Sequence, residues 1–290
     1  KILMKTSSYG WDQGTAPGIS YAEGTIIENI RFQGGRDHTA LDPSYYSAGL
    51  AVGDLGECST IRNCFAHGFN GDGFVSYSGT PAFFLSCSSF NNARFGFATL
   101  CTSGLNTTTF VNCSADDNRG GKYGNRAAPG GVAGGTYTIV GDKSESRKGG
   151  QIIGDFEGQV NVTYTGGTVD VDGNQGPTLG ELFRIRSNGK AWQIDVRGLQ
   201  HSFSVGGLVR NMETGAILST PGPWQAMSFV VNNSGVFNAT RPGIAWNTGT
   251  TPPTGSWTCT TWSACNAGTQ SRTCTCSGTC ADPKPAESQT

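Results

Sequence analysis

Charged residues are scarce in this chain of 290 residues: they make up 14% of it, against about a quarter in typical soluble proteins. Lysine and arginine together number 20, and aspartate and glutamate 21, which gives a net charge of −1. The chain therefore lacks the basic surface that nucleic acids and anionic membranes attract. No apolar run comes close to the length of a membrane span, which is about 18 residues. We expect no nucleic-acid partner and no membrane insertion.

Glycine, by contrast, is abundant, with 44 residues, and aromatic residues reach 10%. Many glycines combined with abundant serine, threonine and asparagine predict an all-β protein with many tight turns. The ten cysteines fall into two groups of five, within residues 58–113 and 259–280. The second group is typical of a disulfide framework, so we expect an extracellular, secreted or virion-surface location.

An internal repeat organises the first half of the chain. The segments IENIRFQGG (27–35), IRNCFAHGF (61–69), LSCSSFNNA (85–93) and VNCSADDNR (111–119) align at spacings of 34, 23 and 26 residues. The alignment places Ile30, Cys64, Cys87 and Cys113 in one column. The preceding column holds Asn29, Asn63, Ser86 and Asn112. A second motif, a glycine followed by a short strand, recurs in GLAV (49–52), GFVS (73–76) and GFAT (96–99).

A repeat of about 23 residues, built from strands too short to form their own core, predicts a solenoid. Coils stacked about 4.8 Å apart would place like residues on like. We expect the cysteine column to point inward as small apolar side chains rather than to bind a metal, because three stacked thiols form no tetrahedral cage. We expect the asparagine and serine column to be a hydrogen-bonded ladder in which Asn112 is buried.

These columns resemble the right-handed parallel β-helix of the pectate-lyase-like superfamily, including its viral tailspike members. The resemblance covers residues 20–125. Residues 136–247 keep a β pattern without the columns, so we expect further coils or a β-rich extension there, with a separate β-sandwich as the alternative. The domain prediction is β-helix coils over 1–135, this extension over 136–247, a linker over 248–256 and a second module over 257–290.

The module after the linker resembles a thrombospondin type 1 repeat. The residues that carry the resemblance are Trp257, Trp262, Ser263, Cys265, Gly268, Gln270, Arg272 and Cys274. The resemblance implies a small disulfide-rich β module in which tryptophan and arginine side chains interleave. It carries five cysteines, an odd number, and the chain starts in mid-pattern at Lys1. We therefore expect truncation at both ends, with one free thiol in the module as the alternative at the C-terminal end.

Polar residues follow the cysteine column on successive coils, and the alignment predicts that they form one exposed strip. Asp72, Asp116 and Asp117 are the candidate catalytic carboxylates, since glycoside hydrolysis uses a pair of carboxyl groups. The candidate substrate-binding residues are His67, Asn91, Asn92, Arg94 and Arg119. Stacked polar groups would suit a polysaccharide or cell-surface glycan. The alternative is that these are ordinary turn residues.

The function expected from the sequence is an extracellular or virion-surface β-helix protein that engages glycans, as adhesins and tailspikes do. One alternative is a polysaccharide lyase or an inverting glycoside hydrolase, although no catalytic motif of the superfamily matches residue by residue. A purely structural fibre element is the other. No cofactor is expected, except calcium if the chain is a lyase. A homotrimer is an assembly that many such spikes adopt.

Overall fold

The computed structural model describes residues 26–34, 48–52, 58–69, 71–77, 81–101, 106–118, 120–127, 133–146, 153–171, 181–201, 207–219, 227–239, 245–247, 256–260, 270–271, 273–277 and 288–289. The chain divides into two compact units, Lys1–Asn247 and Thr248–Thr290. All regular structure in the described ranges is β-strand. Within those ranges, no helix has the length and apolar character needed to cross a membrane.

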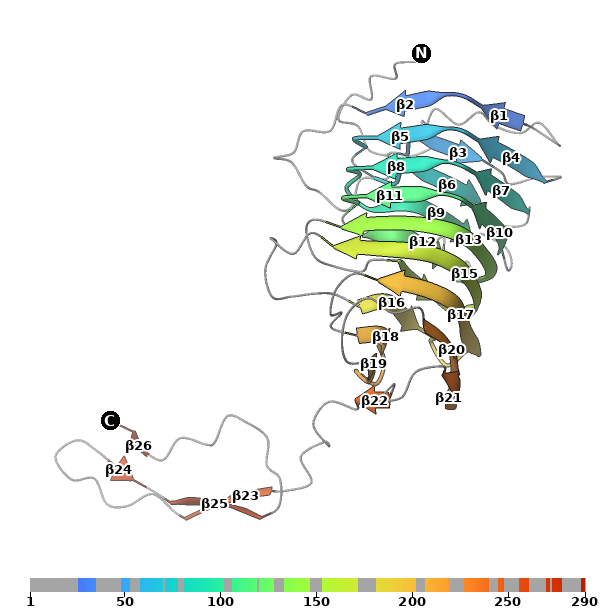
Figure 1. Ribbon diagram of the computed structural model, residues 1–290. Helices are drawn as coiled ribbons and strands as arrows, with labels where there is room; N and C mark the ends of the chain where they lie inside the picture. Colours follow the sequence, from blue (N-terminus) through green and yellow to red (C-terminus); the bar gives the residue numbers. More distant parts are fainter. Residues whose placement is uncertain are drawn as a thin grey trace. The chain divides into compact units, whose positions relative to one another are not determined.

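The first unit is a parallel β-solenoid in which each strand pairs with the equivalent strand of the next coil (Figure 1). One face contains β1 (Ile26–Glu28), β4 (Ser59–Arg62), β7 (Ala82–Leu85), β10 (Asn106–Val111), the first half of β13 (Gly134–Ser146), β15 (Gln159–Val171) and β17 (Trp192–His201). The next face contains β2 (Arg31–Gln33), β5 (Phe65–His67), β8 (Ser88–Phe90), β11 (Ser114–Asp116) and the second half of β13.

The remaining face belongs to a separate sheet made of β3 (Leu50–Val52), β6 (Phe74–Tyr77), β9 (Phe95–Cys101), β12 (Gly121–Ala127), β14 (Gly154–Glu157), β16 (Glu181–Arg186) and β18 (Gly207–Asn211). Parallel coils continue as far as Asn211, and the strands that follow pair antiparallel. These later strands are β19 (Ile217–Ser219), β20 (Met227–Asn232), β21 (Gly235–Ala239) and β22 (Ala245–Asn247).

The predicted inward column is confirmed for its three thiols. Cys64, Cys87 and Cys113 are buried. They lie on successive coils, because the carbonyl oxygens of Cys64 and Cys87 accept hydrogen bonds from the backbone just after the next cysteine in the column. Ile30 stands in the same column, but it is only partly buried and packs against the core from the first coil. Register continues the column to Asp142 in the next coil, where a carboxylate replaces a thiol. Cys58 is a free thiol outside the column.

The asparagine and serine column does not form the buried ladder that the sequence predicted. Asn29, Asn63, Ser86 and Asn112 are exposed and have φ values of 58°, 50°, 51° and 52°. The column instead turns the chain between two faces in the left-handed conformation, which asparagine and glycine tolerate best. Later coils use glycine at this position, since Gly141 has φ of 64°. The turn geometry, rather than a side-chain ladder, explains the residue choice.

Stacked aromatic rings fill the interior. The Phe74 and Phe97 ring centroids lie 5.1 Å apart, and those of Phe84 and Phe110 lie 5.2 Å apart, on successive coils. The glycine that opens each motif is required by close backbone approach. A β-carbon on Gly73 would lie 2.7 Å from the carbonyl oxygen of Gly96. The repeat therefore alternates bulky core residues with positions that admit no side chain.

The second unit contains two short antiparallel pairs in its described residues. β23 (Ser256–Cys259) pairs with β25 (Cys274–Ser277), and β24 (Gln270–Ser271) pairs with β26 (Ser288–Gln289). Trp262, Cys265 and Arg272, on which the thrombospondin resemblance depends, lie outside the described residues. The disulfide framework and the interleaved side chains of this unit therefore stay predictions.

Candidate functional site

The predicted polar strip divides between the outside and the inside of the coil. His67, Phe90 and Asp116 occupy equivalent outward positions at the ends of β5, β8 and β11. The next residue in each coil has a left-handed backbone, with φ of 53° at Asn91 and 52° at Asp117. This second turn redirects the chain toward the third face. Residues just before the turn therefore face solvent, whereas those just after it point into the solenoid.

Asn92 lies after the turn and belongs to an internal asparagine ladder. Its side chain is fully buried, and its Oδ1 accepts a hydrogen bond of 2.9 Å from the backbone N–H of Phe69. Its Nδ2 donates to Asn118 Oδ1 at 2.8 Å and to Ser89 Oγ at 2.9 Å. These bonds satisfy the backbone where the coil turns. The predicted role of Asn92 in touching a glycan is at odds with this burial.

Asp72 and Arg94 are also buried, each with 5% of its surface exposed. Asp72 Oδ1 accepts a hydrogen bond of 2.9 Å from the backbone N–H of Phe95 and lies 3.7 Å from Arg94 Nε. The expectation of one exposed strip is therefore wrong for these two residues and for Asn92. The alignment identified the correct column positions but did not include the reversal at the turn. Arg119 lies outside the described residues.

The outward residues line a shallow groove of about 340 Å³ on the face formed by β5, β8, β11 and β13. Its lining residues are Phe65, Ser88, Ser89, Phe90, Ser114, Ala115, Asp116 and Lys143. The imidazole of His67 stacks on Phe90, with centroids 5.2 Å apart and planes inclined by 9°. The groove thus combines flat aromatic surface with hydroxyl, carboxylate and ammonium groups.

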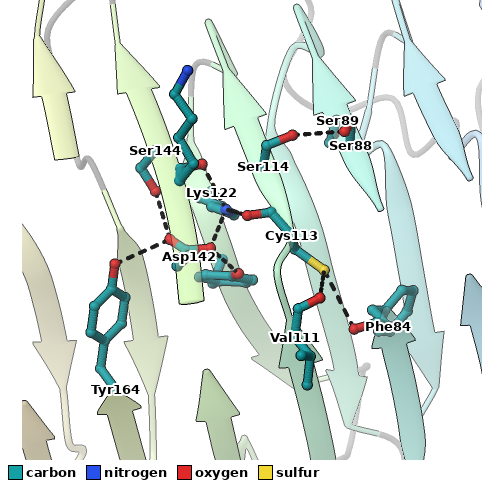
Figure 2. A network of polar contacts seen from close by, with 12 residues as sticks. Phe84, Ser88, Ser89, Val111, Cys113, Ser114, Lys122, Asp142, Ser144 and Tyr164 are labelled. Carbon is teal, nitrogen blue, oxygen red and sulfur yellow. Dashed lines mark hydrogen bonds and ion pairs between the residues drawn. The ribbon is translucent and has the colours of Figure 1, made fainter. Parts of the chain in front are cut away.

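Neighbouring contacts hold this surface in shape. The guanidinium of Arg31 lies 4.7 Å from the centroid of the Phe65 ring, a cation–π distance. Ser88 and Ser114 share a hydrogen bond of 2.7 Å between their hydroxyl oxygens (Figure 2). Both contacts link one coil to the next. The groove is therefore preorganised by the same stacking that forms the solenoid.

A second polar cluster lies inside the solenoid, around Lys122 and Asp142 (Figure 2). Lys122 follows Gly121 on β12, in the column that holds Gly96 in the previous coil. Its ammonium pairs with Asp142 and donates to the carbonyl oxygens of Cys113 at 2.7 Å and Lys143 at 2.9 Å. Lys122, which is equivalent to Gly96 of the previous coil, thus pairs with Asp142, which is equivalent to Cys113 of the previous coil.

The Asp142 carboxylate is fully satisfied within the protein. Tyr123 donates to its Oδ1 at 2.7 Å, while Ser144 and Tyr164 donate to its Oδ2 at 2.9 and 3.3 Å. Burial lowers the pKa of Lys122, and the negative charge of Asp142 opposes that effect. Burial also raises the pKa of Tyr123 and of Tyr164 well above their ordinary value. With every partner supplied internally and no exposed atom, this cluster is structural.

A larger hollow of about 620 Å³ lies beside the turn between β20 and β21, and five of its thirteen lining residues carry amide side chains. The side-chain amide of Asn233 in this hollow is already hydrogen-bonded to the backbone. Its Oδ1 accepts from the Trp192 backbone N–H at 2.8 Å, and its Nδ2 donates to the Lys190 carbonyl at 3.0 Å. Trp192 itself is buried and offers no ring face to a ligand. The groove over β5, β8 and β11 is the better candidate site.

Of the predicted site residues, Asp116 lines the groove and His67 stacks on Phe90 beside it, and the groove adds residues that the sequence reasoning did not assign. Phe65, Phe90 and Lys143 could have been found from their positions, because they alternate with the buried Ala66, Ser89 and Ser144. The chain matches no protein-family model, no curated protein and no solved structure. The groove itself is therefore the basis for assigning a function.

Proposed function

We propose that the first unit is a rigid carbohydrate-binding solenoid and that the groove over β5, β8 and β11 is its glycan site. The observation that carries the proposal is the stack of rings formed by Phe65, His67 and Phe90, next to the hydroxyls of Ser88 and Ser114. Sugars present an apolar ring face and a rim of hydroxyl groups, so they need flat aromatic surface and polar groups together.

The dimensions of the groove suit a short stretch of saccharide. Its volume of about 340 Å³ falls within the usual range of small-ligand sites, about 300–1,000 Å³. Its polar groups repeat from coil to coil at about 4.8 Å, which provides regularly spaced partners along a chain of sugars. Asp116 and Lys143 would accept from and donate to hydroxyl groups at one end.

Binding is better supported than cleavage. Hydrolysis requires two carboxyl groups about 5–9.5 Å apart across the scissile bond. Among the described residues that line the groove, Asp116 is the only carboxylate. Asp72, its expected partner in an inverting pair, is buried and hydrogen-bonded to the backbone of Phe95. Asp117 lies at the turn and is not among the residues that line the groove, and its role in catalysis stays a prediction.

The same proposal includes the type of β-helix, the nature of the second unit and the location of the protein. The parallel solenoid and its turn columns support a right-handed β-helix of the pectate-lyase-like and tailspike kind. In the second unit, Cys259 lies directly opposite Cys274 in the β23–β25 pair, which supports a disulfide-stapled, thrombospondin-like module. An extracellular or virion-surface protein that binds glycans, as a monomer or a homotrimer, fits these features.

A glycan array probed with the full chain tests the proposal. Phe90→Leu keeps apolar volume but removes the ring face, and it should weaken binding about tenfold if stacking anchors the sugar. Met212→Ala is the matched control, because Met212 is an exposed apolar side chain outside the groove. Its binding should equal that of the wild type. Retention of every glycan by Phe90→Leu at wild-type strength contradicts the proposed site. A depolymerisation assay on bound glycans separates binding from cleavage.

A further inference from the structure

A second outer face of the solenoid carries a regular array of threonines. On β10, β13 and β15, alternate residues point inward, as shown by the burial of Phe110, Ile139 and Tyr164. The residues between them point outward and form three registered columns. We call these nine positions the threonine face: Thr107, Thr136 and Asn161; Thr109, Thr138 and Thr163; Val111, Val140 and Thr165.

The threonine face carries no charged residue at any of its nine positions. On β7, the adjacent strand on one side, the same columns hold the apolar Phe83 and Leu85, and the Arg62–Glu28 pair lies beyond them. On the other side, the columns continue to the Arg197–Asp195 pair on β17. Thr107, Thr136 and Asn161 are exposed, and the central column is half-buried between its neighbours. The result is a neutral patch of methyl and hydroxyl groups that borders apolar residues on β7 and charged residues on β17.

The face is also rigid. Threonine and valine are stiff at χ1 because they branch at the β-carbon, and cross-strand neighbours restrict them further. The parallel pairing of β10 with β13 and of β13 with β15 keeps one register across the face. Beneath it, the rings of Phe110 and Tyr123 pack with centroids 4.4 Å apart. A ligand of this face therefore meets a fixed array and loses little conformational entropy.

The array has two fixed repeats. Successive strands are about 4.8 Å apart, and outward residues on one strand are about 6.6 Å apart. A rigid grid is most complementary to another surface with matching repeats. The first of these distances is close to the shorter lattice repeat of the prism face of hexagonal ice. By contrast, the ring faces that a sugar needs are found in the glycan groove and at none of the nine positions of the threonine face.

We propose that the threonine face binds ice. Its hydroxyl groups hydrogen-bond to water molecules, and its methyl groups leave the intervening water to order against an apolar surface. Water held at lattice positions joins the crystal, so the bound protein blocks the growth of that face. No covalent step and no cofactor are needed. The inference is independent of the glycan groove, which lies on the other side of the turn at Gly141.

The test measures inhibition of ice recrystallisation and retention on growing ice by the full chain. Thr138 is the central position of the face, and Thr138→Tyr puts a bulky ring there while keeping high β-propensity. This variant should need an about tenfold higher concentration for the same inhibition, as for a central anchor of a rigid contact. Thr168→Tyr is the matched control: Thr168 is exposed on the same strand, β15, beyond the Gly166 turn. Its activity should match that of the wild type.

Circular dichroism and the melting temperature of each variant report whether the solenoid is intact. A folded wild-type chain that leaves ice growth unchanged overturns the proposal, as does equal loss of activity in both tyrosine variants. Retention on an insoluble polysaccharide that Thr138→Tyr abolishes, without any effect on ice, assigns the face to a saccharide surface instead. A dimer that dissociates in Thr138→Tyr, again without an ice effect, assigns it to a second copy of the chain.

Discussion

The buried pair of Lys122 and Asp142 gives the sharpest prediction about stability. Lys122→Met removes the ammonium and leaves the Asp142 carboxylate in the core with hydroxyl donors alone. Asp142→Asn removes the carboxylate charge and leaves the Lys122 ammonium with two carbonyl acceptors. Each single change therefore leaves one uncompensated group, whose side chain is 1% exposed at Lys122 and 0% at Asp142.

Breaking a buried pair from one side costs about 3–5 kcal/mol, because it leaves an uncompensated buried charge. We expect each single variant to lose about 3–5 kcal/mol of unfolding free energy. The double variant should lose about 2–3 kcal/mol less than the sum of the two, which is the coupling energy of a tight buried pair.

Urea unfolding of the full chain, followed by near-UV circular dichroism of the core tyrosines, measures these differences. Thr168→Val, a change at an exposed site on β15, is the control and should fall within about 0.5 kcal/mol of the wild type. Single variants that lose less than about 1 kcal/mol, or a double variant whose loss equals the sum of both singles, would refute the reasoning, because the pair would then be neither dry nor coupled.

Two further substitutions test the turns and the stability of the fold at low pH. Asn92→Ala deletes the internal amide and removes its hydrogen bonds to the Phe69 N–H, to Ser89 and to Asn118. The unfolding free energy should therefore fall by about 2–4 kcal/mol, and an effect within error of wild type contradicts the ladder. For Glu181, burial raises the pKa, but hydrogen bonds from Arg210 and Arg184 outweigh it, and the pKa lies below its ordinary 4.5. Its folded-state pKa is lowered, so its contribution is present above about pH 4.5 and lost as the pH falls through the folded value. Glu181→Gln should therefore be less stable than wild type by about 1 kcal/mol at pH 7, with the gap closing in acid; a constant gap from pH 7 to 3 contradicts this account.

The coil architecture could be predicted from the sequence because the solenoid repeats its own constraints. Each coil needs a small inward residue at Cys64 and its equivalents, a left-handed turn just before it, and a glycine where backbones approach at Gly73 and Gly96. Such requirements leave matching columns in the sequence. The columns end where the strands lengthen in β13 and β15, and there periodicity alone does not distinguish a coil from a sandwich.

The candidate site was harder to predict because one residue at each turn reverses the direction of the next side chain. Asn91 and Asp117 have left-handed backbones, so Asn92 points inward although it directly follows an outward-facing segment. A linear alignment places these residues together without showing that reversal. The Asp142 carboxylate was missed for a related reason, since the register that aligns it with Cys113 depends on the pairing of β11 with β13. The second turn does leave a column of Gly68, Asn91 and Asp117, but that column does not show by itself which way the following side chains point.

Isothermal titration of the full chain with an oligosaccharide retained on the glycan array tests the central claim most directly. Phe90→Leu reports on the groove of the first unit, and Trp257→Ala reports on the second unit. The proposed function predicts that Phe90→Leu raises the dissociation constant about tenfold, which is about 1.4 kcal/mol, and that Trp257→Ala leaves it unchanged. A folded Phe90→Leu variant with wild-type affinity, combined with loss of binding in Trp257→Ala, would contradict the account and move the glycan site to the second unit.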